Sequence, residues 1–72
     1  MYYYTIAPLS NGIPQPSLTY YSPETIPVEA IAQAPYAKRT IHGIVVGRRN
    51  LRQARASLRS SEFVIKKIES WQ

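Results

Sequence analysis

Aromatic and β-branched residues gather in four short runs along this chain, with polar, charged or turn-forming residues between them. The runs occupy residues 2–9, 17–21, 40–46 and 63–68. Such residues favour extended backbone, and short runs bounded by turn formers are typical of strands. The pattern predicts four strands, the third of them ending at Gly47. Gly43 inside that strand indicates a bulge or a close backbone approach.

Prolines and glycine divide the first half of the chain. Segment 10–16 contains an Asn-Gly pair and two prolines, which predicts a loop. Two further X-Pro pairs at 22–23 and 26–27 predict a connection without a helix, because the residue before proline disfavours helical backbone. Segment 28–34 stays open: its alanines and glutamine favour a helix, whereas its short length between prolines also suits a strand.

After the third strand, Asn50 is placed to cap a helix, and Leu51, Ala54 and Leu58 recur at spacings of three and four. This spacing predicts a short helix at roughly residues 50–59. About five short strands with one such helix are typical of a small barrel-like or half-barrel sheet. We therefore predict a mainly β fold in a single domain covering residues 1–72.

Charge is distributed unevenly between the two halves of the chain. Residues 1–37 contain two glutamates and no lysine or arginine, whereas residues 38–72 contain all nine basic residues, and the net charge is +5. A basic half of this kind predicts a partner that carries phosphates. The lack of cysteine and aspartate, the single histidine and the absence of a phosphate-binding glycine loop predict no catalytic site, no metal and no cofactor.

The first residues lack the cationic and apolar regions of a signal peptide, and no apolar run approaches the roughly 20 residues that span a bilayer. We therefore expect a cytoplasmic protein without a membrane partner. A basic amphipathic segment 51–59 lying on a membrane surface is a third-ranked alternative, because the segment is short and has little apolar area.

Four arginines follow a helical spacing of four, three and four residues: Arg48, Arg52, Arg55 and Arg59. On a helix they would share one face and could meet several phosphates of one strand. The alternative is the solvated side of an amphipathic helix. We favour phosphate contact, because no glutamate lies among these arginines and like charges at this spacing oppose helix formation.

The tyrosines could stack on unpaired bases or fill the interior. We assign Tyr2, Tyr4 and Phe63 to the core, and expect the tyrosines beside turns, Tyr20, Tyr21 and Tyr36, to be more exposed. His42 is expected to be a hydrogen-bonded or exposed strand residue without a site role.

Four blocks in order resemble the N-terminal domain of the primosomal protein N′ (PriA) family of bacterial replication-restart helicases. They are Tyr2–Leu9 ending in Ala-Pro-Leu, Leu18-Thr19-Tyr20 followed by Pro23-Glu24, Pro35–Arg39 leading into Ile41–Val46, and Lys66-Lys67-Ile68. The resemblance covers nearly the whole chain, although the helicase lobes and the zinc-binding insertion of that family have no counterpart here.

In that family the domain captures the 3′ end of a nascent strand at a stalled fork. The resemblance implies a pocket for the terminal nucleotide and a strand at 30–34. We add Arg39 to the four arginines above as a residue expected to contact phosphate. The resemblance also implies fork-like DNA as partner, together with other primosome or single-strand-binding proteins. The implied pocket residues are Leu18, Thr19, Tyr20, Tyr36, Ala37, Lys38 and Lys66.

Two positions depart from the family pattern: Thr19 stands where many members have aspartate, and Ala37 where they have glycine. Threonine accepts a hydrogen bond from a 3′-hydroxyl more weakly than a carboxylate does. The charge and the tyrosines also fit a different function, a small basic RNA- or ribosome-associated protein.

Overall fold

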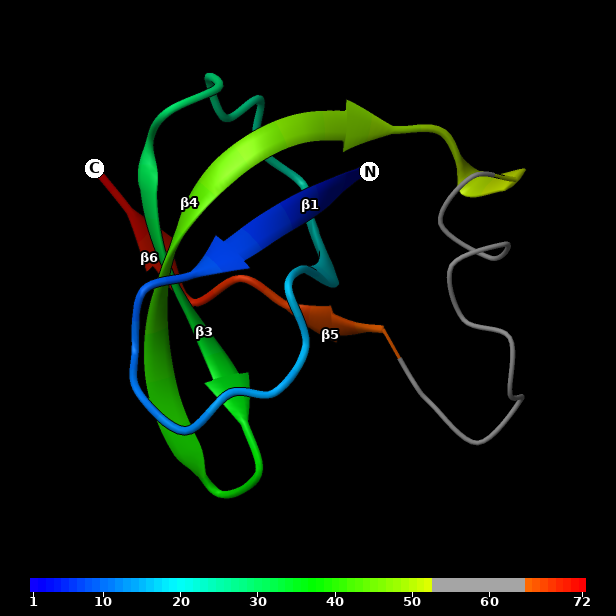
Figure 1. Ribbon diagram of the computed structural model, residues 1–72. Coiled ribbons are helices and arrows are strands. Elements are labelled where there is room, and N and C mark those ends of the chain that lie inside the picture. The colour runs from blue at the N-terminus through cyan, green and yellow to red at the C-terminus, as the bar shows by residue number, and fades with distance from the viewer. Residues whose placement is uncertain (53–64) are drawn as a thin grey trace.

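The computed structural model describes residues 1–52 and 65–72, which form one curled sheet of six strands (Figure 1). The strands are β1 Tyr2–Pro8, β2 Leu18–Ser22, β3 Ile31–Tyr36, β4 Arg39–Arg49, β5 Lys66–Lys67 and β6 Ser70–Trp71. Their order in the sheet is β5-β2-β1-β4-β3-β6, and every neighbouring pair is antiparallel except β2 and β5. The predicted mainly β half-barrel is confirmed.

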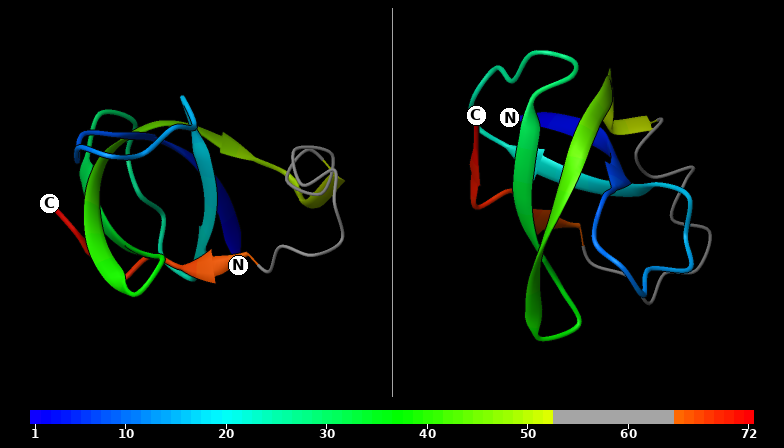
Figure 2. Two further views of the ribbon diagram at one scale, coloured as in Figure 1. Left: turned by 60° about the horizontal axis from the view of Figure 1, so that its bottom comes forward. Right: turned by 60° about the vertical axis from the view of Figure 1, so that its left-hand side comes forward.

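The two edge strands of the sheet, β5 and β6, follow each other in the chain. The sheet curls so that the short segment between them can join its two edges (Figure 2). Ile68 and Glu69 form the link between them. The Ile68 N–H donates to the Tyr21 carbonyl oxygen, and the Glu69 N–H donates to the Gln33 carbonyl oxygen, each at 2.8 Å. The C-terminal segment thus bridges the two edges of the half-barrel.

Alternate residues of the central strands fill the interior of the half-barrel. On β3 the inward residues are the small Ala32 and Ala34. The Tyr20 ring crosses the interior from β2, and its hydroxyl donates to the Pro35 carbonyl oxygen at 2.8 Å. Each large apolar side chain buried in this way contributes about 1.5–3 kcal/mol. The core consists of Tyr4, Ile6, Tyr20, Ile26, Ala30, Ala32, Ala34, Ile41, Val45 and Ile68.

Segment 28–34 contains the beginning of strand β3, so the helix that residue propensity favours there is wrong. Alternate residues Ala30, Ala32 and Ala34 are buried, and β3 pairs along its whole length with β4. Burial on one face and ladder hydrogen bonds together outweigh a weak helical preference. The loop at 10–16 and the helix-free connection through the two X-Pro pairs are both confirmed.

Strand β4 does not end at Gly47 as predicted but continues to Arg49. A register shift opposite Thr5 and Ile6 lets β4 accommodate one extra residue, after which it pairs with β1 again. Gly43 is the site of a close approach, as expected: a Cβ there would overlap Ile6 Cγ2 and lie 3.0 Å from the Ala7 carbonyl oxygen.

The C-terminal predictions are confirmed only in part. Of the strand expected at 63–68, Lys66–Lys67 forms β5, Ile65 and Ile68 lie outside it, and residues 63 and 64 lie outside the described part of the chain. The sequence did not predict β6. Residues 53–59 of the expected helix also lie outside the described residues, so that helix stays a prediction. No helix in the described ranges is long and apolar enough to cross a membrane.

Candidate nucleic-acid interface

Tyr20 links the three segments that were expected to form a 3′-end pocket. It is the register partner of Lys66 in the parallel β2–β5 pair. Its hydroxyl donates to the Pro35 carbonyl oxygen, directly before Tyr36, at 2.8 Å. Burial raises the pKa of the Tyr20 hydroxyl, and the neighbouring Tyr36 phenol adds to this shift. The structure therefore brings β2, β5 and the base of the β3–β4 turn together.

The expectation that Tyr20 is exposed is wrong, because only 4% of its surface is accessible. Its ring lies in the core and cannot stack on a base. The other two residues of the β2 segment are half-buried: Leu18 packs against the core, and Thr19 pairs with Thr5 of β1. The β2 segment can line one side of a binding site, but its Tyr20 ring is buried beneath that surface and does not face a ligand.

The β3–β4 connection is a two-residue turn whose residues, Ala37 and Lys38, have φ angles of 45° and 67°. Positive φ at both positions is typical of a type I′ hairpin turn. Alanine adopts this backbone at a cost of about 1 kcal/mol, which glycine avoids. The turn is tied to the β1–β2 loop, since Arg39 Nη2 donates to the Asn11 carbonyl oxygen at 2.6 Å and Tyr36 Oη donates to Gln15 Oε1 at 3.0 Å.

Arg48 does not belong to a helical arginine face, because it lies in strand β4. Its guanidinium carbon lies 5.1 Å from the centroid of the Tyr2 ring, within the range of a cation–π contact. Arg39 is the first residue of the same strand. Arg39 and Arg48 therefore lie near opposite ends of strand β4.

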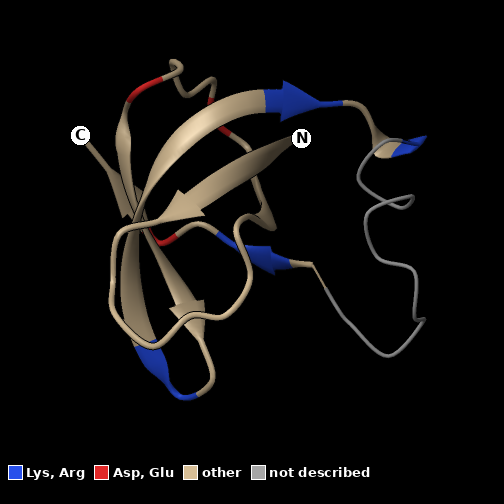
Figure 3. Cartoon of the chain, in the orientation of Figure 1, with Lys and Arg blue, Asp and Glu red and all other residues tan. Residues whose placement is uncertain are grey.

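Of the remaining arginines predicted to contact phosphate, Arg52 is exposed. Arg55 and Arg59 lie outside the described residues. Figure 3 shows the basic residues of the described chain at the end of β4 and just beyond it, on β5 and at the β3–β4 turn. The described glutamates lie in the links between β2 and β3 and between β5 and β6.

The registers of four neighbouring strands align two rows of residues, one on each face of the sheet. We call Arg48, Tyr4, Tyr20 and Lys66 the inner row, and Arg49, Tyr3, Tyr21 and Lys67 the outer row. Each row begins and ends with a cation and has two tyrosines between. The sequence analysis did not predict either row, because both rows depend on strand order and register. The sequence feature that could have indicated them is the occurrence of two consecutive residues of the same kind at 3–4, 20–21, 48–49 and 66–67.

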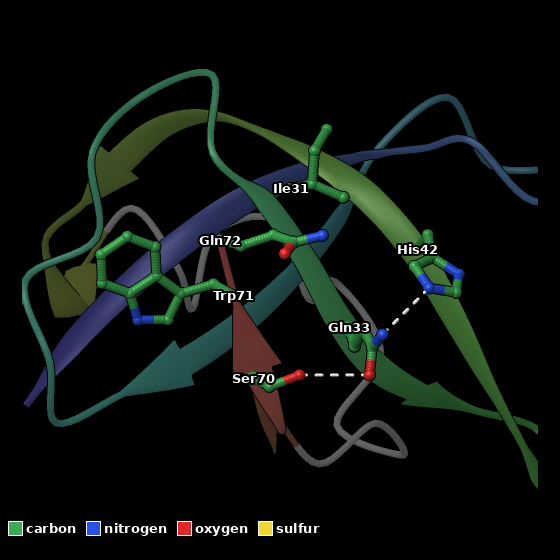
Figure 4. A pocket seen from close by; sticks show the side chains of 6 residues that line it. All are labelled: Ile31, Gln33, His42, Ser70, Trp71 and Gln72. Carbon is green, nitrogen blue, oxygen red and sulfur yellow. Dashed lines mark hydrogen bonds between the residues drawn. The ribbon is translucent and has the colours of Figure 1, made fainter.

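A separate polar hollow of about 260 Å³ lies beside β3 and β6 (Figure 4) and contains none of the predicted pocket residues. Gln33 Nε2 lies 3.1 Å from His42 Nε2, and Ser70 Oγ donates to Gln33 Oε1 at 3.1 Å. His42 is thus an exposed, hydrogen-bonded strand residue, as expected. Within residues 1–52 and 65–72 no group of three or more potential metal ligands is gathered at one place.

No family model, curated protein or solved structure matches this chain significantly. The resemblance to the primosomal protein N′ family therefore rests on the sequence blocks quoted above.

Proposed function

We propose that this chain is a cytoplasmic DNA-binding module that captures the 3′ end of a nascent strand at a stalled replication fork and so contributes to primosome assembly and replication restart. The observation that carries the proposal is the convergence at Tyr20. Three segments that are far apart in the sequence meet through one hydrogen bond, from Tyr20 to Pro35, and one strand pair, of Tyr20 with Lys66. Thr19 faces the opposite side of the sheet from Tyr20 and Lys66.

The chemistry of these segments suits a strand terminus. Lys38, Arg39 and Lys66 are exposed and supply positive charge for the last phosphates of the strand. Ala37 has the left-handed backbone that favours glycine, and glycine is the residue that many members of the resembled family carry at this place. Because Thr19 is a neutral residue where many members of that family have a carboxylate, we expect the preference for a free 3′-hydroxyl to be modest.

The arginines have a separate role in this proposal. Arg48 and Arg52 lie toward the far end of β4 from the turn and would contact phosphates without reading sequence. Arg55 and Arg59 remain proposed members of the same phosphate-contacting group. Primosome and single-strand-binding proteins are the proposed protein partners.

The test compares two duplexes that differ only in carrying a recessed 3′-hydroxyl or a 3′-phosphate, with affinity measured by fluorescence anisotropy. The unmodified chain should bind the hydroxyl end more tightly. Lys66→Ala should weaken binding to that end by roughly tenfold, the size expected for one charge-assisted contact, and so reduce the preference. Lys67→Ala is the matched control, because Lys67 faces the other side of the sheet; it should affect both duplexes alike.

Equal binding of the unmodified chain to both ends would contradict end capture. An equal loss for both duplexes on Lys66→Ala would remove Lys66 from the pocket. A matched RNA oligonucleotide that competes as well as DNA would indicate an RNA-associated protein instead.

A further inference from the structure

The geometry points to a second contact surface: we propose that the outer row, Arg49, Tyr3, Tyr21 and Lys67, is a stacking platform for an unpaired DNA strand. This surface is distinct from the proposed 3′-end pocket, whose Lys66 belongs to the inner row, although Thr19 lies on the same face of the sheet as the platform. The inference rests on the proposed function only in taking DNA, rather than RNA, as the nucleic acid.

The spacing of the outer row fits successive nucleotides. Tyr3 pairs with Tyr21 across β1 and β2, Arg49 lies beyond Tyr3 on β4, and Lys67 lies beyond Tyr21 on β5. With neighbouring strands about 4.8 Å apart, the row spans about 14 Å. A strand lying along it would meet two adjacent aromatic rings between two cations, which is the combination that sequence-independent single-strand binding uses.

The two tyrosine side chains of the outer row do not lie in the core. Both are half-buried, whereas Tyr4 and Tyr20 on the opposite face are 0% and 4% accessible. The Tyr3 hydroxyl lies 3.9 Å from the sulfur of the exposed Met1, so its contact is at the surface. These rings are therefore placed to accept a base.

The charge of this face selects for a polyanion. Strands β1, β2, β4 and β5 contain no acidic residue within their bounds. Arg49 Nε donates to Thr5 Oγ1 at 3.0 Å, which directs the guanidinium along the outer face, and Lys67 is exposed. Cations alone would suit any acidic partner, but aromatic faces between them favour unpaired bases over duplex DNA or acidic protein.

The two proposed surfaces meet at β5, where Lys66 belongs to the inner row and Lys67 to the outer row. A strand whose end occupies the pocket could thus continue onto the platform. The platform does not need an end, however, and this separates the two proposals by experiment.

The experiment uses the full chain and a closed circle of single-stranded DNA that contains one 2-aminopurine, whose fluorescence falls when it stacks. The unmodified chain should bind the circle and quench this base. Tyr3→Leu and Tyr21→Leu should each weaken binding roughly tenfold and reduce the quenching, since aromatic stacks carry this much affinity. Tyr3→Phe and Tyr21→Phe retain the ring and should bind like the unmodified chain.

A second pair of variants, Arg49→Gln and Lys67→Gln, changes exposed side chains without altering the aromatic pair. Each should weaken binding and reduce the steepness of its salt dependence. The platform is refuted if the leucine variants bind and quench as the unmodified chain does, or if the chain does not bind the circle. A circle of RNA bound equally well would overturn the assignment to DNA. Loss of the 3′-hydroxyl preference in the duplex experiment would leave the circle result standing.

Discussion

The inner and outer rows have the same composition and come from the same four strands, yet they face opposite sides of the sheet. In the inner row the Tyr4 hydroxyl donates to the Glu24 carbonyl oxygen at 2.7 Å and accepts from the Ile26 N–H at 2.8 Å. The Tyr20 hydroxyl likewise donates a hydrogen bond to the Pro35 carbonyl oxygen at 2.8 Å. In the outer row Tyr3 and Tyr21 remain half-exposed. Adjacent tyrosines with identical propensities thus have different surroundings.

The difference in hydrogen bonding and exposure separates the structural contributions of the two faces. The inner tyrosines hold the β2–β3 connection and the end of β3 in place, and so stabilise the frame on which the turn and β5 are positioned. The outer tyrosines leave their rings partly at the surface, where the proposed platform would use them. The comparison predicts that substitutions of the inner tyrosines affect stability and that substitutions of the outer tyrosines affect binding.

The largest separation is expected between Tyr4→Phe and Tyr3→Phe, which remove one hydroxyl each. Tyr4→Phe leaves the buried Ile26 N–H without its acceptor, and an unsatisfied buried group costs about 1–3 kcal/mol. Tyr3→Phe removes only a surface contact and should change the free energy of unfolding by less than about 0.5 kcal/mol. Urea denaturation followed by circular dichroism measures both values.

In a domain of this size the larger loss matters, because a single small core rarely supplies more than about 3–5 kcal/mol of stability. Equal losses for the two variants would contradict the division of the rows into a structural and a binding face. A larger loss for Tyr3→Phe would reverse it.

A smaller effect is expected from pH. The pKa of Tyr20 is raised by burial and by the neighbouring Tyr36, so the folded state favours the protonated phenol. Its contribution is fully present below the unfolded pKa of about 10 and is lost as pH rises through the higher folded value. The difference in unfolding free energy between the unmodified chain and Tyr20→Phe should therefore stay constant up to about pH 9 and shrink as the pH rises above about 10. A constant difference would show that ionisation of Tyr20 does not oppose folding.

The sequence predicted those parts of the fold where residue type and position agree. Runs 2–9 and 40–46 are rich in aromatic or β-branched residues and lie in central strands, so their propensities and their pairing point the same way. Ser70–Trp71 carries no strand pattern and is extended because the edge of β3 pairs with it. Arg48 is in a strand for the same kind of reason, namely its pairing with Tyr4. Partners distant in sequence decide such segments.

The candidate site was harder to predict than the fold. The pocket segments came from a family resemblance, and residue patterns alone would not have joined Tyr20 to Lys66. Tyr20 and Tyr21 are indistinguishable as residues beside a turn, but the register buries the first and leaves the second half-exposed. Prediction of the outer row would have required the order of four strands in the sheet, which no local sequence pattern contains.

The central claim, that the basic strands of this chain bind nucleic acid through phosphates, is tested most directly by measuring affinity for a single-stranded DNA oligonucleotide as a function of salt concentration. Contacts to about four phosphates, at about 0.7 per phosphate, predict a linear plot of log affinity against log salt with a slope of about −3. Absence of binding at low salt, or a slope near zero, would contradict the claim.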